Sequence, residues 1–312
     1  MKKMMLMAVT ALMVAGCSSD ENGNGTTNEV PKYITVNANI SGLTKAATDR
    51  TGAMVFEAGD AISVYAWTGD KNSLPASLQG YVVANAINTY DGSLWTAQPQ
   101  MLWKNMTDSH YFLAVYPQKD ITVSTDFNLD TQDQQASDIL VAVNKGSNDA
   151  GITATNNAIP LVFDHIMAKL QINLNFRNQW AQTPEADVKV KAKTTGTIDY
   201  LNKSVTANGE AQTVGVMAVS TPVDGYEKTC ETVMIPQQGF NTITVTINNK
   251  DYIYTHANEL GQAKDFVLER GKMTVVNLIV GRDEIELGSV TINNWNEGNI
   301  YGDGEDIEVP GE

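Results

Sequence analysis

Residues 166–176 read Ile-Met-Ala-Lys-Leu-Gln-Ile-Asn-Leu-Asn-Phe, a stretch in which apolar residues alternate with mostly polar ones. Successive side chains of a β-strand point to opposite faces, so this alternation predicts a strand with one buried face and one mostly solvated face. The predicted buried face consists of Ile166, Ala168, Leu170, Ile172, Leu174 and Phe176. No long window of the chain shows helical spacing. The stretch therefore predicts a fold built mainly from strands.

The same period of two recurs on both sides of this stretch. The other predicted strands are residues 33–40, 61–67, 111–116, 139–143, 188–192, 232–235, 242–247, 252–255, 266–268, 273–280 and 289–295. Polar segments at residues 126–138, 144–157 and 202–212 are predicted to be loops. Many short strands separated by Gly, Asn, Asp and Pro are typical of β-sandwiches.

A chain of 312 residues is long enough for about two domains of roughly 150 residues each. Residues 178–187 interrupt two strand-like runs and contain Pro184. A break of this kind, with segments of similar size on either side, predicts a domain boundary. We therefore expect an N-terminal domain over residues 32–180 and a C-terminal domain with an acidic tail over residues 181–312.

The charge balance argues against nucleic-acid binding. Lys and Arg number 21 against 36 Asp and Glu, which gives a formal net charge of −15. An acidic protein repels phosphate backbones. The expected partners therefore do not include nucleic acid.

Motifs for catalysis or cofactor binding are not found in the sequence. The pair Gly271-Lys272 has Phe266 where a phosphate-binding loop needs its first glycine, and neither Gly-x-Ser-x-Gly nor His-Glu-x-x-His occurs. Residues 126–130 imitate the start of a calcium loop, but Thr131 and Ser137 replace its glycine and its closing glutamate. We expect no enzyme activity, no cofactor and no metal. A glycosidase that uses two unidentified carboxylates stays open as an alternative.

The first residues predict export from the cell. Lys2 and Lys3 precede an apolar stretch at residues 4–14, which is too short to cross a bilayer as a mature helix. The following Val-Ala-Gly-Cys sequence at residues 14–17 resembles a bacterial lipobox. This resemblance implies that residues 1–16 are a removed signal peptide and that Cys17 carries lipid; an ordinary signal peptide is the alternative.

Polar residues 17–31 are predicted to be a flexible tether. Within it, Asp20-Glu21 resembles the surface-export signal of lipoproteins from Bacteroides-type anaerobes. With Cys17 acylated, Cys230 has no partner for a disulfide and is predicted to be a small core residue. His165 is predicted to be a buried structural imidazole.

Several phrases, in order along the chain, together resemble a known family. They are Phe-Glu-Ala-Gly-Asp-Ala-Ile-Ser-Val-Tyr-Ala at residues 56–66, Tyr-Phe-Leu-Ala-Val-Tyr-Pro at 111–117, Asp-Ile-Leu-Val-Ala at 138–142, Phe-Asp-His-Ile-Met-Ala-Lys-Leu at 163–170, Ile-Pro-Gln at 235–237 and Ile-Asn-Asn-Trp-Asn-Glu-Gly at 292–298. With the lipobox, they resemble the fimbrillin-like (type V pilin-related) lipoproteins of Bacteroides-type anaerobes. The resemblance implies an all-β fold with two tandem transthyretin-like β-sandwich domains. It also implies an outer-membrane lipoprotein at the cell surface that is a subunit of a fimbrium.

The same resemblance implies how subunits would join. In the family, a trypsin-like protease cuts after a basic residue near the end of the first strand, and a strand from a neighbouring subunit fills the groove. Here Arg50 and Lys45 lie in a polar stretch and are the candidate cleavage positions. A cut there would release residues 33–40, whose inward face carries Ile34, Val36, Ala38 and Ile40. The partners would be copies of this chain or other fimbrial subunits.

Other roles remain open at this point. The chain could be a stalk, anchor or tip subunit, because residues 300–309, which contain glycines and acids, make a poor donor strand. It could instead be a monomeric surface lipoprotein that binds a host glycan or protein, with Trp95 and Trp103 as stacking platforms. The alternative for both tryptophans is packing in the core or between domains.

Overall fold

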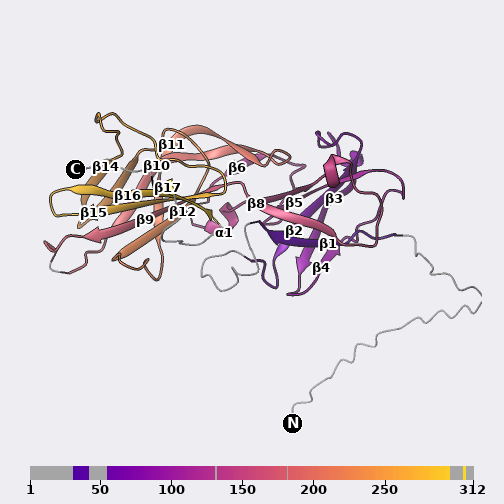
Figure 1. Cartoon of the computed structure of the whole chain (residues 1–312), viewed down its shortest axis with the longest axis horizontal. Helices are drawn as coiled ribbons and strands as arrows, with labels where there is room; N and C mark the ends of the chain where they lie inside the picture. The colour runs from indigo at the N-terminus through magenta and orange to yellow at the C-terminus, as the bar shows by residue number, and fades with distance from the viewer. Residues whose placement is uncertain (1–30, 42–54, 131, 181, 296–304, 307–312) are drawn as a thin grey trace, which may run out of the picture. The chain divides into compact units, whose positions relative to one another are not determined.

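The computed structural model describes residues 31–41, 55–130, 132–180, 182–295 and 305–306 (Figure 1). Nearly all regular structure in these residues is β, which confirms the predicted fold class. The single α-helix among them, α1 (Gln134–Ser137), is one turn long. Within the described ranges, no helix has the length and apolar character needed to cross a bilayer. The strands form two sheets that build sandwich-like domains.

The first sheet has seven strands in the order β1-β8-β7-β5-β2-β3-β4. Their bounds are β1 (Val36–Ile40), β2 (Ala61–Thr68), β3 (Tyr81–Tyr90), β4 (Trp95–Gln98), β5 (His110–Tyr116), β7 (Leu140–Asn144) and β8 (Ile159–His165). The segment before β1 lies beside the segment after β4, because Ile34 N–H donates to the Met101 carbonyl (3.0 Å) and Trp103 N–H donates to the Lys32 carbonyl (3.3 Å). The two ends of the sheet therefore meet and enclose one apolar core.

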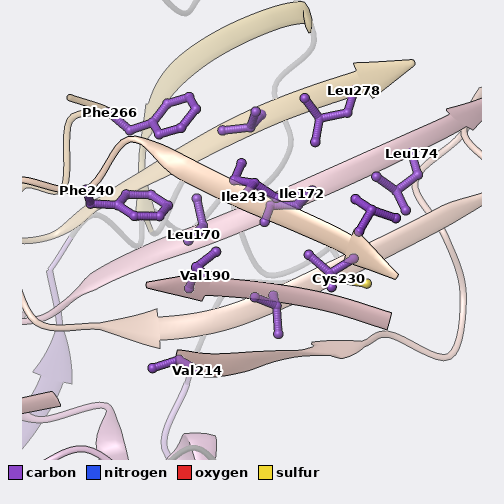
Figure 2. Close-up of a cluster of buried hydrophobic side chains, with 14 of the residues drawn as sticks. Leu170, Ile172, Leu174, Val190, Val214, Cys230, Phe240, Ile243, Phe266 and Leu278 are labelled. Carbon is purple, nitrogen blue, oxygen red and sulfur yellow. The ribbon is translucent and has the colours of Figure 1, made fainter. Parts of the chain in front are cut away.

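The second sheet has ten strands, in the order β14-β13-β10-β11-β12-β9-β15-β16-β17, with β6 paired to β10. Their bounds are β6 (Asp126–Asn128), β9 (Ala168–Phe176), β10 (Asp187–Asp199), β11 (Ser204–Ala218), β12 (Lys228–Met234), β13 (Thr242–Ile247), β14 (Lys250–Thr255), β15 (Lys272–Val280), β16 (Ile285–Asn294) and β17 (Glu305–Asp306). Figure 2 shows side chains of β9, β10, β11, β13 and β15 meeting in a common core.

β9 differs from its prediction in two ways. The predicted strand starts at residue 166, but β9 begins at Ala168, and Ile166 and Met167 are buried in the connection from β8. The face predicted to be mostly solvated is also buried: Gln171 and Asn173 are almost inaccessible. Asn173 forms hydrogen bonds with both neighbouring strands. Its Oδ1 accepts from Thr229 Oγ1 of β12 (2.8 Å), and its Nδ2 donates to Asn277 Oδ1 of β15 (2.8 Å). A central strand can bury amides when neighbouring strands supply their partners.

The segment at residues 202–212 is a second correction, because most of it lies in β11 and is not a loop. β11 pairs along its length with β10 to form a long hairpin. The sequence shows little alternation there because residues 204–212 of β11 are mostly exposed to solvent, with only Val205 and Ala207 half-buried. The predicted loop at residues 126–138 likewise contains β6, which pairs with β10, and the short α1.

Apart from β6, which pairs with β10, the chain passes from the first sheet to the second at residues 166–167, between β8 and β9. This lies before the interruption at residues 178–187 from which the boundary was predicted. β9 therefore belongs to the sheet of the second half, although the predicted division assigns it to the first. The domain limits at residues 180 and 181 stay a prediction.

Candidate assembly site

β1 lies at one edge of the first sheet and pairs there with a single strand. It runs parallel to β8, with Val36 opposite Ile159 and Ile40 opposite Phe163. Ile159 N–H donates to the Thr35 carbonyl and Ser41 N–H donates to the Phe163 carbonyl, both at 2.8 Å. Among the described residues, no strand pairs with the other side of β1. One ladder of backbone hydrogen bonds thus holds this strand in the sheet.

The side chains of β1 and of the residues before it nevertheless complete the core. Ile34, Val36 and Ile40 are only 3%, 5% and 3% exposed, and Ala38 is half-buried. All four contact the apolar cluster of the first sheet. The predicted inward face is thus where the structure buries it, although β1 itself begins at Val36 and Tyr33 forms only an isolated bridge to Leu102.

Removal of these side chains would open an apolar groove. Burial of a Val, Leu or Ile side chain contributes about 1.5–3 kcal/mol, so the three buried residues together contribute roughly 5–9 kcal/mol as an upper estimate. The groove would also expose the unpaired backbone groups of β8, which form a template for another strand.

The chain after the connection at residues 42–54 has its own attachment to the sheet. Phe56 makes edge-on contacts with Trp95 (5.1 Å between ring centroids), Tyr116 (5.4 Å) and Phe163 (5.4 Å). Nearby, Tyr116 Oη donates to Asp60 Oδ1 at 3.0 Å. The start of the β2 segment is therefore fixed by contacts that do not involve β1.

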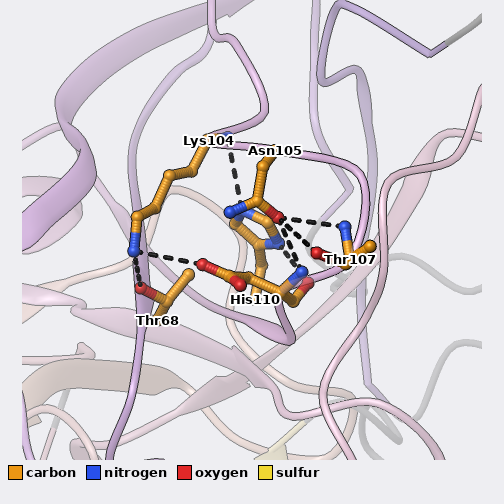
Figure 3. A network of polar contacts seen from close by, with 6 residues as sticks. Thr68, Lys104, Asn105, Thr107 and His110 are labelled. Carbon is orange, nitrogen blue, oxygen red and sulfur yellow. Dashed lines mark hydrogen bonds and ion pairs between the residues drawn. The ribbon is translucent and has the colours of Figure 1, made fainter.

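A polar network supports the segment that meets residues 32–34 (Figure 3). Lys104 Nζ donates to Thr68 Oγ1 and pairs with Asp108, both at 3.1 Å. Lys104 N–H lies 3.3 Å from His110 Nε2, and His110 Nδ1 lies 3.0 Å from the Asp108 carbonyl. These partners assign the neutral tautomer with the proton on Nδ1. Burial lowers the pKa of His110, which favours this neutral form.

The two candidate stacking tryptophans have different surroundings. Trp103 is buried in the core, edge-on to His110 (4.9 Å) and Phe112 (5.8 Å). For Trp103, the structure favours core packing over ligand stacking. Trp95 is half-buried and stacks on Tyr90 at 5.0 Å, so part of its ring remains accessible.

The other two side chains singled out in the sequence, Cys230 and His165, are both buried. Cys230 is buried with a free thiol, and burial raises its pKa to about 11. His165 is buried, as predicted; its Nδ1 lies 2.8 Å from Asp138 Oδ1, and its ring stacks on Trp295 at 4.3 Å. In the described part of the chain, no group of three His, Cys, Asp or Glu side chains is placed to hold a metal ion.

Comparisons with known proteins identify the family of the chain. A family model described as fimbrillin-like matches residues 44–295, which is most of the chain and includes strands of both sheets. The chain belongs to the fimbrillin-like family.

Solved structures similar to this fimbrillin-like chain show the same fold. A candidate cell adhesion protein from Bacteroides uniformis is 17% identical, with a TM-score of 0.59, and the match covers 84% of this chain and 98% of that one. One from Bacteroides ovatus is 16% identical, with a TM-score of 0.62, and the match covers 85% and 98% of the two chains. No curated protein sequence matches the chain.

Three residues of the predicted site lie outside the described residues. They are the lipidation candidate Cys17 and the cleavage candidates Lys45 and Arg50. The family match begins at residue 44, so β1 also precedes it. Two contacts were not predicted from the sequence: the aromatic contacts of Phe56 and the approach of residues 101–103 to the segment before β1. Phe56 could have been noticed as the first residue of the family phrase at residues 56–66. No local sequence pattern indicates that residues 101–103 lie beside the segment before β1.

Proposed function

We propose that this fimbrillin-like chain is a non-enzymatic subunit of a cell-surface fimbrium that joins its neighbours by strand exchange. One observation carries the proposal: an edge strand with a single pairing partner contributes two buried side chains to the core, and Ile34 just before it contributes a third. Such a strand can be replaced by another strand of similar pattern without change to the rest of the sheet. The new strand would restore the buried apolar surface and the backbone hydrogen bonds together.

Cleavage within residues 42–54 would separate β1 from β2. Lys45 and Arg50 are the basic residues available there to a trypsin-like protease. Because Phe56 and Asp60 make their own contacts with the sheet, the new N-terminus would remain attached after β1 leaves. Contacts made by strand exchange between successive copies are head-to-tail, so they extend into a filament.

Export and anchoring complete the proposal. The leader at residues 1–16 and Cys17 fit a lipoprotein precursor held in the outer membrane by its acyl chains, each buried CH₂ contributing about 0.8 kcal/mol. Cleavage after Lys45 or Arg50 would then free the subunit from its lipid at the same step that opens its groove. Anchoring and assembly would be mutually exclusive states of one chain.

The proposal is tested with a precursor that cannot be cut. Cells that carry the Lys45→Ala/Arg50→Ala double variant should retain the chain as a membrane-bound monomer and show no filaments of it by electron microscopy. A Lys71→Ala/Lys145→Ala variant, which removes two lysines outside the connection, should assemble normally. Filaments of the uncleavable variant that still contain β1 would contradict strand exchange.

A further inference from the structure

Three lysines form a row along the outer face of β10. Lys189 and Lys191 are exposed and Lys193 is half-buried, and they alternate with the buried Val188, Val190 and Ala192. Alternate residues of a strand are about 6.7 Å apart, so the lysine row (Lys189, Lys191 and Lys193) extends over about 13 Å.

The residues beside the row are small or neutral. On β11, the lysines pair with Gly215, Thr213 and Ala211, all of which are exposed. On β13, Thr244 pairs with Lys189. A Cβ added at Gly215 would meet nothing within 4 Å, so the surface beside Lys189 is open. The row therefore borders a flat shelf of small side chains and threonine hydroxyls.

No carboxylate neutralises the row. Within the described ranges, none of its three ammonium groups takes part in an ion pair, whereas Lys169 pairs with Glu231 at 2.7 Å and Lys203 with Asp164 at 2.6 Å. The acids on the same face lie at one end. They are Asp187, Asp251 and Glu231, of which Asp251 accepts from Thr246 Oγ1 at 2.7 Å and Glu231 pairs with Lys169.

Lysines without an ion pair, such as Lys145 and Lys264, also occur elsewhere in the described residues, so the row is distinguished by three adjacent ammonium groups on one strand face. Like charges on alternate residues of one strand, about 6.7 Å apart, repel each other. An uncompensated row of like charges therefore reduces stability, and an external polyanion would relieve this repulsion. Distant acids of the protein interfere little, because the Debye length is about 8 Å at physiological ionic strength.

A cleft of about 240 Å³ continues this surface at the Lys189 end. Its lining includes Lys189, Gly215, Met217 and Lys228, together with Asp187, Gln132, Cys230 and neighbouring apolar residues. The cleft adds a fourth lysine close to the row and gives space for groups larger than a single ion.

We propose that the lysine row and its shelf bind a linear anionic polysaccharide. Sulfate or carboxylate groups of the polymer would contact the ammonium groups, and its hydroxyls would bond with Thr213 and Thr244. An acidic peptide fits less well, because most backbone groups along the row are already bonded: β11 pairs with all three lysines, β13 pairs with Lys189, and the Gln237 side chain bonds the Lys193 backbone. The inference concerns the adhesive surface of one subunit and does not depend on strand exchange.

Binding is measured on the full chain, produced without export and in monomeric form, so that a failure of assembly does not affect the result. The probe is dextran sulfate, with neutral dextran and polyglutamate of matched length for comparison. We expect saturable, salt-sensitive binding of dextran sulfate and weaker binding of the other two. The K189Q/K191Q/K193Q variant would lose three exposed ion pairs between its lysines and the sulfate groups of the polymer, which should weaken binding about tenfold.

Two further variants distinguish the effect of the lysine row from the effect of net charge. K71Q/K145Q/K264Q makes the same change in net charge elsewhere and should bind nearly as well as the unchanged chain. K189R/K191R/K193R retains the charges and should also bind. Equal losses in both Gln variants, stronger binding of polyglutamate, or no saturable binding of dextran sulfate would each overturn the inference. Thermal melting confirms that every variant is folded.

Discussion

Replacement of Ile40 by alanine should lower the free energy of unfolding substantially, although Ile40 lies on an edge strand. Ile40 is 3% exposed and belongs to the cluster that also contains Ile62 and Phe163. The substitution removes three carbon atoms, worth about 0.8 kcal/mol each when buried, and leaves a partly collapsed cavity. Because an edge strand can relax into the gap, we expect a loss of about 2–3 kcal/mol, near the lower end of the usual 2–5 kcal/mol.

Urea unfolding of the full chain, followed by tryptophan fluorescence, measures this loss. Trp67, Trp95 and Trp103 lie in or beside strands of the first sheet and report on its transition. Asn37→Ala is the matched control, since Asn37 is an exposed residue of the same strand. It should change the free energy of unfolding by less than about 0.5 kcal/mol. If Ile40→Ala costs as little as the control, β1 does not complete the core and the groove argument fails.

Three further predictions concern other buried groups. Burial lowers the pKa of His110 below its usual 6.5, so the unfolded state binds more protons in mild acid and the free energy of unfolding should fall as the pH drops below about 6.5. Urea unfolding at several pH values measures this, and the free energy of unfolding of His110→Gln should depend less steeply on pH. An equal pH dependence of the two proteins would contradict the prediction. Burial raises the pKa of Cys230 to about 11, so a thiol reagent at pH 8 should label the Cys17→Ser chain only after unfolding, and fast labelling of the folded chain would contradict the burial. Phe56→Ala should cost about 1–3 kcal/mol in urea unfolding, because a half-buried ring loses three aromatic contacts, and Phe56→Leu should cost less; equal effects would argue against the aromatic anchor.

Alternation was sufficient to predict strands whose two faces differ. β2, β5, β13 and β15 lie close to their predicted limits, because their sequences carry a regular apolar face or an apolar run. The same reasoning failed for the second face of β9. Gln171 and Asn173 are polar in the sequence, but Asn173 finds partners on β12 and β15, and Gln171 Nε2 donates to Asn173 Oδ1. The partners on β12 and β15 are distant in the chain, so no local pattern reveals them.

β3, β4, β6, β8, β11 and β17 were not predicted. In β3, Asn85 has φ +51° and the pairing with β2 shifts register, so the period of two is broken. The first half of β11 is largely solvated, and its partner on β10 supplies the pairing that its own side chains do not indicate. Strands held mainly by their neighbours lack the alternation from which a single sequence predicts a strand.

The candidate site was partly predictable for the same physical reason. The inward face of residues 34–40 is apolar at every second position, and three of its four residues are buried. The parallel pairing with β8 and the approach of residues 101–103 depend on contacts across more than 60 residues of chain. Trp103 illustrates the limit: the sequence leaves both ligand stacking and core packing open for it, and the structure packs it against Phe112.

The central claim is that β1 is absent from the assembled subunit. Mass spectrometry of the chain recovered from purified filaments tests it most directly, because it identifies the first residue of each subunit. The account predicts chains that begin just after Lys45 or Arg50 and contain no peptide from residues 33–40. Filaments whose subunits still carry Ile34, Val36 and Ile40 in an uncut chain would contradict it.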